Sequence, residues 1–112
     1  MKMCEEMVRL REALTKMSVK WTDHSDIVTD EMLEEKKKIY PNISSVFLDT
    51  TMYRTWFEYR GYEISVIYGY GSWGGPNGFG TDPRLLEARF GMNEEPIGWL
   101  TADKVLAKLE EL

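Results

Sequence analysis

One cysteine and one histidine occur among the 112 residues, and this scarcity excludes several kinds of site. Cys4 alone forms neither a disulfide framework nor a thiolate zinc site, so we expect a reducing, cytoplasmic environment. His24 alone cannot build a multi-histidine metal site. Glu5 and Glu6 lie where a signal peptide needs an apolar run, and no run approaches the roughly 18 apolar residues of a membrane helix. The sequence therefore predicts neither secretion nor a membrane partner.

Clustered positive charge is also scarce. The formal net charge is −5, and the one basic run, Lys36 to Lys38, directly follows Glu34 and Glu35. Such a run is typical of a solvated helix face with ion pairs at i,i+3 and i,i+4. Neutralising the phosphates of a duplex needs grouped lysines and arginines, so we expect no direct binding to duplex DNA.

Helical periodicity marks the two ends of the chain. Apolar residues recur at spacings of three and four over 2–17, and Thr101 caps a second apolar stripe that begins at Val105. Between them we expect irregular chain over 18–30, then a short exposed helix over 31–39, capped by Asp30 and ended by Tyr40-Pro41. The methionines of the first helix adapt to irregular surfaces, so docking onto a sheet and a homodimer contact both stay open for it.

The middle of the chain has the period of two that is typical of strands. We expect the strand-like alternation of side chains to begin at Val46. A β-hairpin over 53–68 that turns at Arg60-Gly61 should follow, and then a further strand at about 85–90. A two-residue turn sets Phe57 opposite Ile64. The sequence thus predicts a single α+β domain over 1–112, a small antiparallel sheet with the N- and C-terminal helices packed on it.

A glycine-rich loop over 69–80 separates these strands, with six glycines in twelve residues. It spells G-x-G-x-x-G after a strand, but Gly75-Pro76 prevents the helix that a dinucleotide site requires. The loop is then either a hairpin connection packed down by its own aromatic residues or a binding element. Loops of this length are uncommon in small domains and favour function.

The sequence indicates no set of residues that would form a catalytic centre. Asp23-His24-Ser25-Asp26 contains the residue types of a hydrolase triad, but sequence neighbours do not converge on one reacting atom, so we expect a turn or an Asx-type cap there. Cys4 beside two glutamates is expected to be inert. We therefore predict no catalytic residues, no metal ligands and no cofactor.

Two binding hypotheses remain. The first is contact with another protein, because tryptophan and arginine are enriched at interface hot spots; its residues are Trp73, Tyr70, Phe79, Trp56 and Arg54. A helix covering the hairpin face of Trp56 is the alternative there. The second hypothesis is a small nucleotide-like ligand held by an anion nest of backbone amides; its residues are Gly71, Ser72, Trp73, Arg84 and Glu87.

The segment I-S-V-I-Y-G-Y-G-S-W-G-G over 64–75, with Leu85-Leu86-Glu87 and Pro96 to Val105, resembles a group of small bacterial proteins encoded near phage and conjugative-element genes. The likeness spans about 53–106 and departs at Arg84, where the pattern has glycine. The resemblance implies no activity for any residue. It implies a mobile-element accessory protein, and with it an inhibitor of a host defence system such as CRISPR–Cas.

These observations together predict a non-enzymatic protein that acts by stoichiometric contact. An acidic protein complements a basic nucleic-acid channel, so a defence nuclease is one expected target. A toxin, with this chain as its immunity protein, is another target of the same class.

Overall fold

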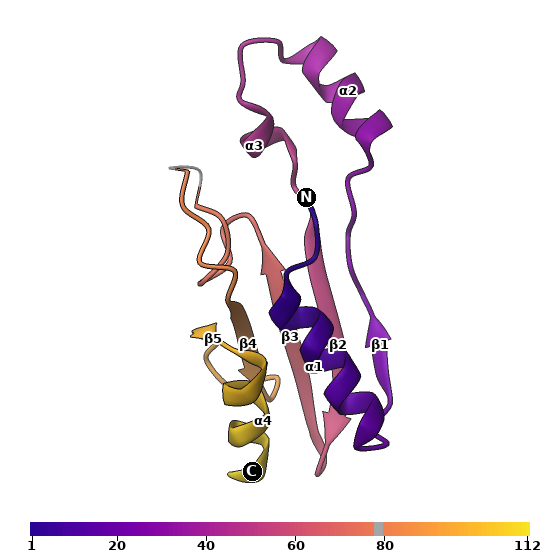
Figure 1. Ribbon diagram of the computed structural model, residues 1–112, viewed down its shortest axis with the longest axis vertical. Helices are drawn as coiled ribbons and strands as arrows, with labels where there is room; N and C mark the ends of the chain where they lie inside the picture. The colour runs from indigo at the N-terminus through magenta and orange to yellow at the C-terminus, as the bar shows by residue number, and fades with distance from the viewer. Residues whose placement is uncertain (78–79) are drawn as a thin grey trace.

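The centre of the molecule is a five-stranded antiparallel sheet, seen in a computed structural model that describes residues 1–77 and 80–112 (Figure 1). Strand order follows chain order. The strands are β1 (Trp21–Asp23), β2 (Met52–Tyr59), β3 (Tyr62–Gly69), β4 (Leu86–Phe90) and β5 (Ile97–Leu100). The predicted α+β class is confirmed, with a sheet wider than the three expected strands.

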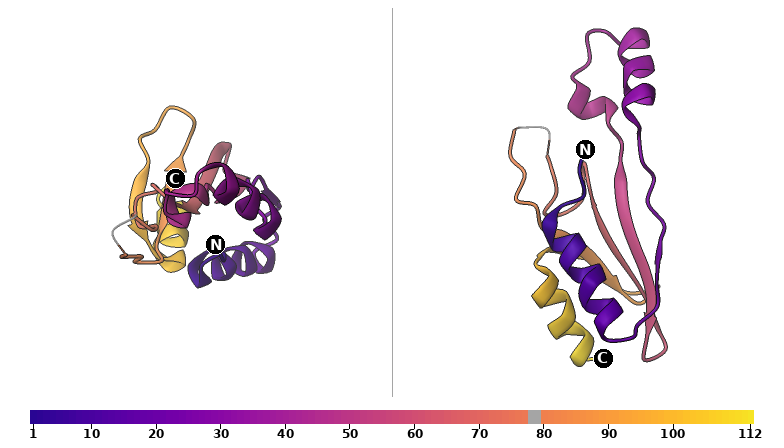
Figure 2. Two further views of the ribbon diagram at one scale, coloured as in Figure 1. Left: turned by 90° about the horizontal axis from the view of Figure 1, so that it is seen from above. Right: turned by 45° about the vertical axis from the view of Figure 1, so that its right-hand side comes forward.

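Two helices, α1 (Glu5–Lys16) and α4 (Ala102–Glu110), contact each other and lie on the same face of the sheet (Figures 1 and 2). Their apolar stripes and the inward residues of β2, β3 and β4 form one core. The fully buried members include Met7, Leu10, Leu14, Phe57, Ile64, Val66, Leu86, Val105 and Leu109. The stripe of α1 therefore docks onto the sheet through Met7, Leu10 and Leu14, which leaves Met7 unavailable for a dimer contact, while Met17 at the C-cap is 41% exposed.

A hydrogen bond between the two terminal helices and a local cap complete this layer. The side chain of Glu6 in α1 accepts the backbone N–H of Ala102, the first residue of α4, at 2.8 Å. Thr101 caps the same helix by accepting the N–H of Lys104 at 3.2 Å, as predicted. A carboxylate near the first turn also interacts favourably with the helix dipole, so α1 stabilises the start of α4.

The hairpin register is confirmed residue by residue. Phe57 lies opposite Ile64, and the like-charged Glu58 lies opposite Glu63. Arg60 and Gly61 both have positive φ, 50° and 84°, as the two central residues of a type I′ turn require. This turn matches the twist of the flanking strands and fixes which face each side chain occupies.

Three short elements were not predicted. Residues 18–30, which we expected to be irregular, contain β1, and Trp21 of this strand pairs with Phe57. Alternation expected from Val46 is wrong, because Ser45–Leu48 is a helical turn, α3, and the strand begins only at Met52. β5 pairs Leu100 with Leu86 at the far edge. Strands of three or four residues are too short to show a period, and long-range pairing alone forms them.

Between β1 and β2 the chain leaves the sheet and forms a projecting arm, residues 27–50, which carries α2 (Asp30–Ile39) and α3 (Figure 2). The arm lengthens the molecule to 47 Å against 25 and 24 Å in the other directions. Thr29, not the expected Asp30, caps α2 by accepting the N–H of Met32. Every residue of α2 is at least partly exposed, as expected. None of the helices in 1–77 and 80–112 has the length and apolarity to cross a membrane.

Candidate protein-binding face

The sheet face opposite α1 and α4 is left uncovered by the helices of the described part of the chain (Figures 1 and 2). Side chains alternate between the two faces along each strand, so this face carries the residues whose neighbours in sequence point into the core. This open face carries Arg54, Trp56, Ser65, Ile67, Glu87 and Arg89, all partly or fully exposed. The alternative in which a helix covers Trp56 is therefore wrong, because both packed helices lie on the other side.

A shallow cavity of about 240 Å³ runs across the open face and combines both signs of charge. Its lining consists of Arg54, Ser65, Ile67, Glu87, Arg89 and Pro96. The register explains the grouping, since Arg54 lies opposite Ile67, Ile67 opposite Glu87, and Ser65 opposite Arg89. Two guanidinium groups and one carboxylate beside an apolar side chain suit a polypeptide surface, which offers the complementary mixture.

At the β1 edge of this face, His24 stacks on Trp56. The ring centroids are 5.8 Å apart with 1° between the planes, and the N–H of His24 donates to the carbonyl of Arg54 at 3.0 Å. Asp23 accepts the N–H of Ser25 at 2.9 Å, an Asx-type hydrogen bond. The chain does not turn here, however, because Asp23 pairs with Thr55 and Asp26 bridges Met52, so the Asp-His-Ser-Asp string continues alongside β2. Hydrogen bonds from Ser25 and the nearby guanidinium of Arg11 hold the pKa of Asp23 below its usual value.

At the opposite edge, Trp73 of the loop stacks on Trp99 of β5. The indole centroids are 6.2 Å apart and the planes differ by 4°. Both side chains reach solvent, with 49% of Trp73 and 56% of Trp99 exposed. The N–H of Trp73 donates to the carboxylate of Glu87 at 2.8 Å, and the N–H of Trp99 donates to the carbonyl of Trp73 at 3.0 Å. The pair is thus fixed from two strands while remaining accessible.

Local backbone features make this arrangement specific. A β-bulge sets Gly98 and Trp99 together against the single residue Glu87, and Trp99 has a φ of 53°. A Cβ at position 98 would lie 2.2 Å from the Cβ of Trp73, so glycine alone permits this approach. The sequence indicates Trp73 as a binding residue but gives no comparable indication for Trp99 or for the stacking of His24. For Trp99, the signal was a glycine directly before a tryptophan in a segment with no period.

In the described part of the glycine-rich loop, several backbone amides already donate to acceptors within the loop. Gly71 donates to Pro76, Ser72 to Gly69, and Gly75 to Ser72, at 3.0 to 3.2 Å. The Ser72 hydroxyl, almost fully buried, bonds both the N–H and the carbonyl of Gly69. These donors therefore have partners already and do not converge on an open anion site, which removes the main support for the nucleotide-like ligand.

Two other predicted binding residues, Tyr70 and Arg84, lie apart from this pair. Tyr70 faces the arm, where its ring and that of Phe47 lie edge to face with their centroids 5.5 Å apart. Arg84 is exposed, with a φ of 57° and its N–H donated to Asp82. Phe79 lies outside the described residues. Of the predicted residues, the fold thus brings Trp73, Trp56, Arg54 and Glu87 onto the open face or its edge.

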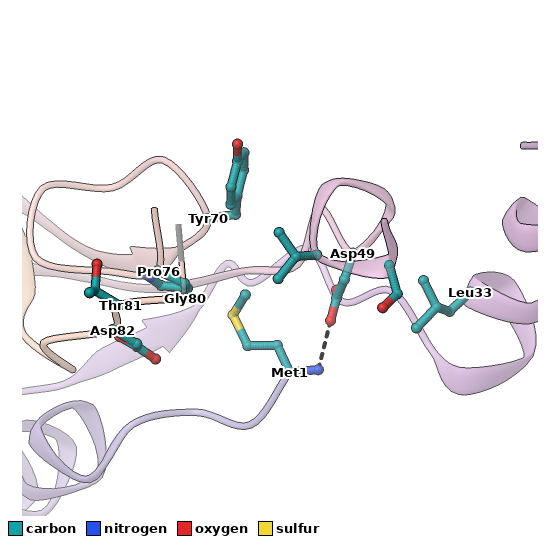
Figure 3. A pocket seen from close by; sticks show the side chains of 10 residues that line it. Met1, Leu33, Asp49, Tyr70, Pro76, Gly80, Thr81 and Asp82 are labelled. Atoms are coloured by element: carbon teal, nitrogen blue, oxygen red, sulfur yellow. Dashed lines mark hydrogen bonds and ion pairs between the residues drawn. The ribbon is translucent and has the colours of Figure 1, made fainter. Parts of the chain in front are cut away.

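A second cavity, of about 370 Å³, lies between the arm, the loop and the first residue of the chain (Figure 3). Its lining is mostly apolar, with Leu33 and Tyr70 among the contributors and Asp82 at one end. The ammonium group of Met1 contacts Asp49 at 2.8 Å. Burial alone would raise the pKa of Asp49, but hydrogen bonds from this ammonium group and from Thr51 outweigh it and lower the pKa. Two carboxylates beside apolar walls do not suit a phosphate group.

The remaining reactive groups are either buried or dispersed. Cys4 is buried in the core, and burial raises the pKa of its thiol, so the nucleophilic thiolate is disfavoured. Within residues 1–77 and 80–112, no three His, Cys, Asp or Glu side chains come together as metal ligands.

Comparisons with known proteins add no assignment. No protein-family model matches this chain, and searches of curated proteins and of solved structures find no similar protein.

Proposed function

We propose that this chain is a non-enzymatic protein of the cytoplasm that binds another protein through its open face and the adjoining Trp73–Trp99 pair. The observation that supports this most strongly is the pair itself, two half-exposed indoles held in one orientation at a sheet edge. Tryptophan and arginine dominate the energetics of protein interfaces, and Arg54 and Arg89 lie in the adjoining cavity.

The apolar surface of the Trp73–Trp99 pair is large enough to form a hot spot of binding energy. A large aromatic side chain buries roughly 150–250 Å², so covering the exposed halves of two indoles removes on the order of 200 Å² of mainly apolar surface from water. At about 25 cal/mol per Å², this is worth about 5 kcal/mol before the costs of association. The hydrogen bonds at Trp73 and Trp99 lower those costs, because the rings lose little further freedom on binding.

The overall charge of the chain, rather than that of the open-face cavity, favours a partner with a basic cleft. The net charge of −5 opposes nucleic-acid binding and complements a channel built to hold nucleic acid. Together with the resemblance to mobile-element proteins, this supports an inhibitor of a host defence nuclease. An immunity protein against a nuclease toxin would use the same surface and belongs to the same proposal.

Capture from host lysate with matched variants tests the proposal. The wild-type protein, the double variant Trp73→Ala/Trp99→Ala and a control, Val8→Ala/Met17→Ala, are immobilised in parallel. The control removes exposed apolar atoms from α1 and its C-cap, on the helical side of the sheet. We expect a protein that wild type and control retain and the tryptophan variant loses. The purified pair should then show a dissociation constant raised at least thirtyfold, the effect of about 2 kcal/mol. Equal affinity of the tryptophan variant and wild type would contradict the proposal.

A further inference from the structure

Two arginines in the cavity of the open face have no anionic partner in the described chain. Arg54 of β2 and Arg89 of β4 both line this cavity. Within residues 1–77 and 80–112, neither guanidinium group forms an ion pair or donates a hydrogen bond. Other arginines of the chain do contact a carboxylate; they are Arg9, Arg11 and Arg60. The N–H donors of Arg54 and Arg89 are thus available to a ligand.

Glu87 is the one carboxylate in the lining of this cavity, and it cannot neutralise both arginines. Its Oε1 accepts the N–H of Trp73 at 2.8 Å, which directs the group toward the loop. Were Glu87 to turn toward one arginine, the other would still keep its charge, because a carboxylate carries a single negative charge. Glu58 and Glu63 lie nearer the hairpin turn and outside the lining. The cavity therefore has an excess of positive charge.

This excess limits what can cover the open face. A protein bound there removes water from both guanidinium groups, and a charge that loses its water needs a counterion and hydrogen-bond acceptors. Because the described chain supplies only Glu87, the missing acceptor must come from the partner. We propose that the bound protein inserts an acidic side chain, Asp or Glu, into the cavity between Arg54 and Arg89. This proposal rests on the proposed function and names the chemical group that the partner presents to that face.

The size and the walls of the cavity fit one such side chain. Its volume of about 240 Å³ lies below the roughly 300–1,000 Å³ that is typical of sites for whole small molecules. A guanidinium group binds a carboxylate through paired N–H donors, which makes the contact directional as well as charged. Ser65, opposite Arg89, offers a hydroxyl donor, while Ile67 and Pro96 supply apolar walls for the methylene groups of the inserted side chain.

An acidic side chain at this point is compatible with a partner whose cleft is basic overall. Enzymes that act on nucleic acids hold Mg²⁺ through one or two carboxylates next to the phosphates that they bind. In such a partner, the acidic residues elsewhere in this chain face the basic rim of the cleft, and the two arginines meet a carboxylate inside it. Charge pairs of both signs then fix the orientation of the complex.

A peptide selection tests the carboxylate before any partner is known. Immobilised wild-type protein selects from a displayed library of random short peptides, and we expect the retained peptides to be enriched in Asp or Glu. The tightest peptide is then synthesised with its acid and with the corresponding amide, Asn or Gln. The amide form should bind wild type at least about tenfold more weakly.

Variants of the protein show whether the acid binds in the cavity. Arg54→Gln/Arg89→Gln should bind the acid peptide at least about tenfold more weakly than wild type and should not distinguish acid from amide. Lys16→Gln/Lys104→Gln removes the same charge from exposed positions on α1 and α4, and this control should bind as wild type does. A selection without acidic enrichment, or an arginine variant that still prefers the acid, would overturn the proposal.

The protein captured from lysate separates this proposal from the proposed function. We expect Arg54→Gln/Arg89→Gln to raise its dissociation constant at least about tenfold, with Lys16→Gln/Lys104→Gln unchanged. If the arginine variant binds like wild type while Trp73→Ala/Trp99→Ala does not, the acidic side chain is ruled out and the proposed function stands. If the tryptophan variant binds like wild type, the proposed function fails, whereas loss of the acid peptide by the arginine variant still identifies a carboxylate site.

Discussion

The carbonyl of Trp73 accepts the N–H of Trp99, and the two indoles stack with 4° between their planes. One residue comes from the glycine-rich loop and the other from the edge strand β5, so the contact joins two segments that meet only in the folded chain. The loop is therefore an ordered platform at this point, and its aromatic group is shared with the sheet.

Alanine at either tryptophan should cost little stability. Each ring is about half exposed, so we expect Trp73→Ala and Trp99→Ala each to lower the free energy of unfolding by about 1–2 kcal/mol. Phe57→Ala, which empties a buried site, should cost about 3–5 kcal/mol. Urea unfolding with a common m-value provides the comparison. A loss at Trp73 as large as that at Phe57 would show that the ring is a structural anchor.

A single methyl group at position 98 should separate the two rings. In Gly98→Ala, the new Cβ would meet the Cβ of Trp73 at 2.2 Å, so the backbone must shift. We expect the far-ultraviolet exciton signal of the stacked indoles to fall and the free energy of unfolding to drop by about 1–3 kcal/mol. Gly71→Ala is a useful comparison, because its Cβ would meet no atom within 4 Å, although its φ of 84° adds strain. An unchanged exciton signal in Gly98→Ala would show that the contact is not as tight as described.

Acid should remove the stabilisation supplied by Asp49. Its pKa is lower in the folded chain than its ordinary value of 3.8, so the charged form stabilises the fold above that value. The contribution is lost as pH falls from about 4 through the folded pKa. Asp49→Asn should be about 1 kcal/mol less stable than wild type at pH 7, and the difference should shrink below pH 4. Asp30→Asn, in the exposed first turn of α2, is the control. A difference that does not change with pH would contradict this role.

Cys4 should react with thiol reagents only through unfolding. Its side chain is buried in the core, and burial raises the pKa of the thiol above its ordinary value of 9.0. We expect labelling by a disulfide reagent at pH 8 to be at least a hundredfold slower than in urea, since the open state is rarely populated. Rapid labelling of the native protein would place Cys4 on a surface instead.

Local patterns predict the hairpin well and its surroundings poorly. Arg60-Gly61 and strict alternation determine the register of β2 and β3, and with it the positions of Arg54 and Trp56 on the open face. Trp99 escapes prediction because the bulge opposite Glu87 interrupts the alternation that would have assigned its face. The sequence also predicts an exposed short helix for α2, but not that it leaves the sheet, because departure depends on β1 pairing with β2 across the intervening arm.

The contact of Glu6 with Ala102 has a consequence for synthesis of the chain. Helix α1 leaves the ribosome early, but the helix it packs against is made about a hundred residues later. Until α4 has emerged, the nascent protein exposes apolar core residues that only the last helix covers, a state prone to aggregation and to capture by chaperones. Translation arrested shortly before Thr101 should therefore yield a chain that proteases cleave readily, while release of α4 restores resistance.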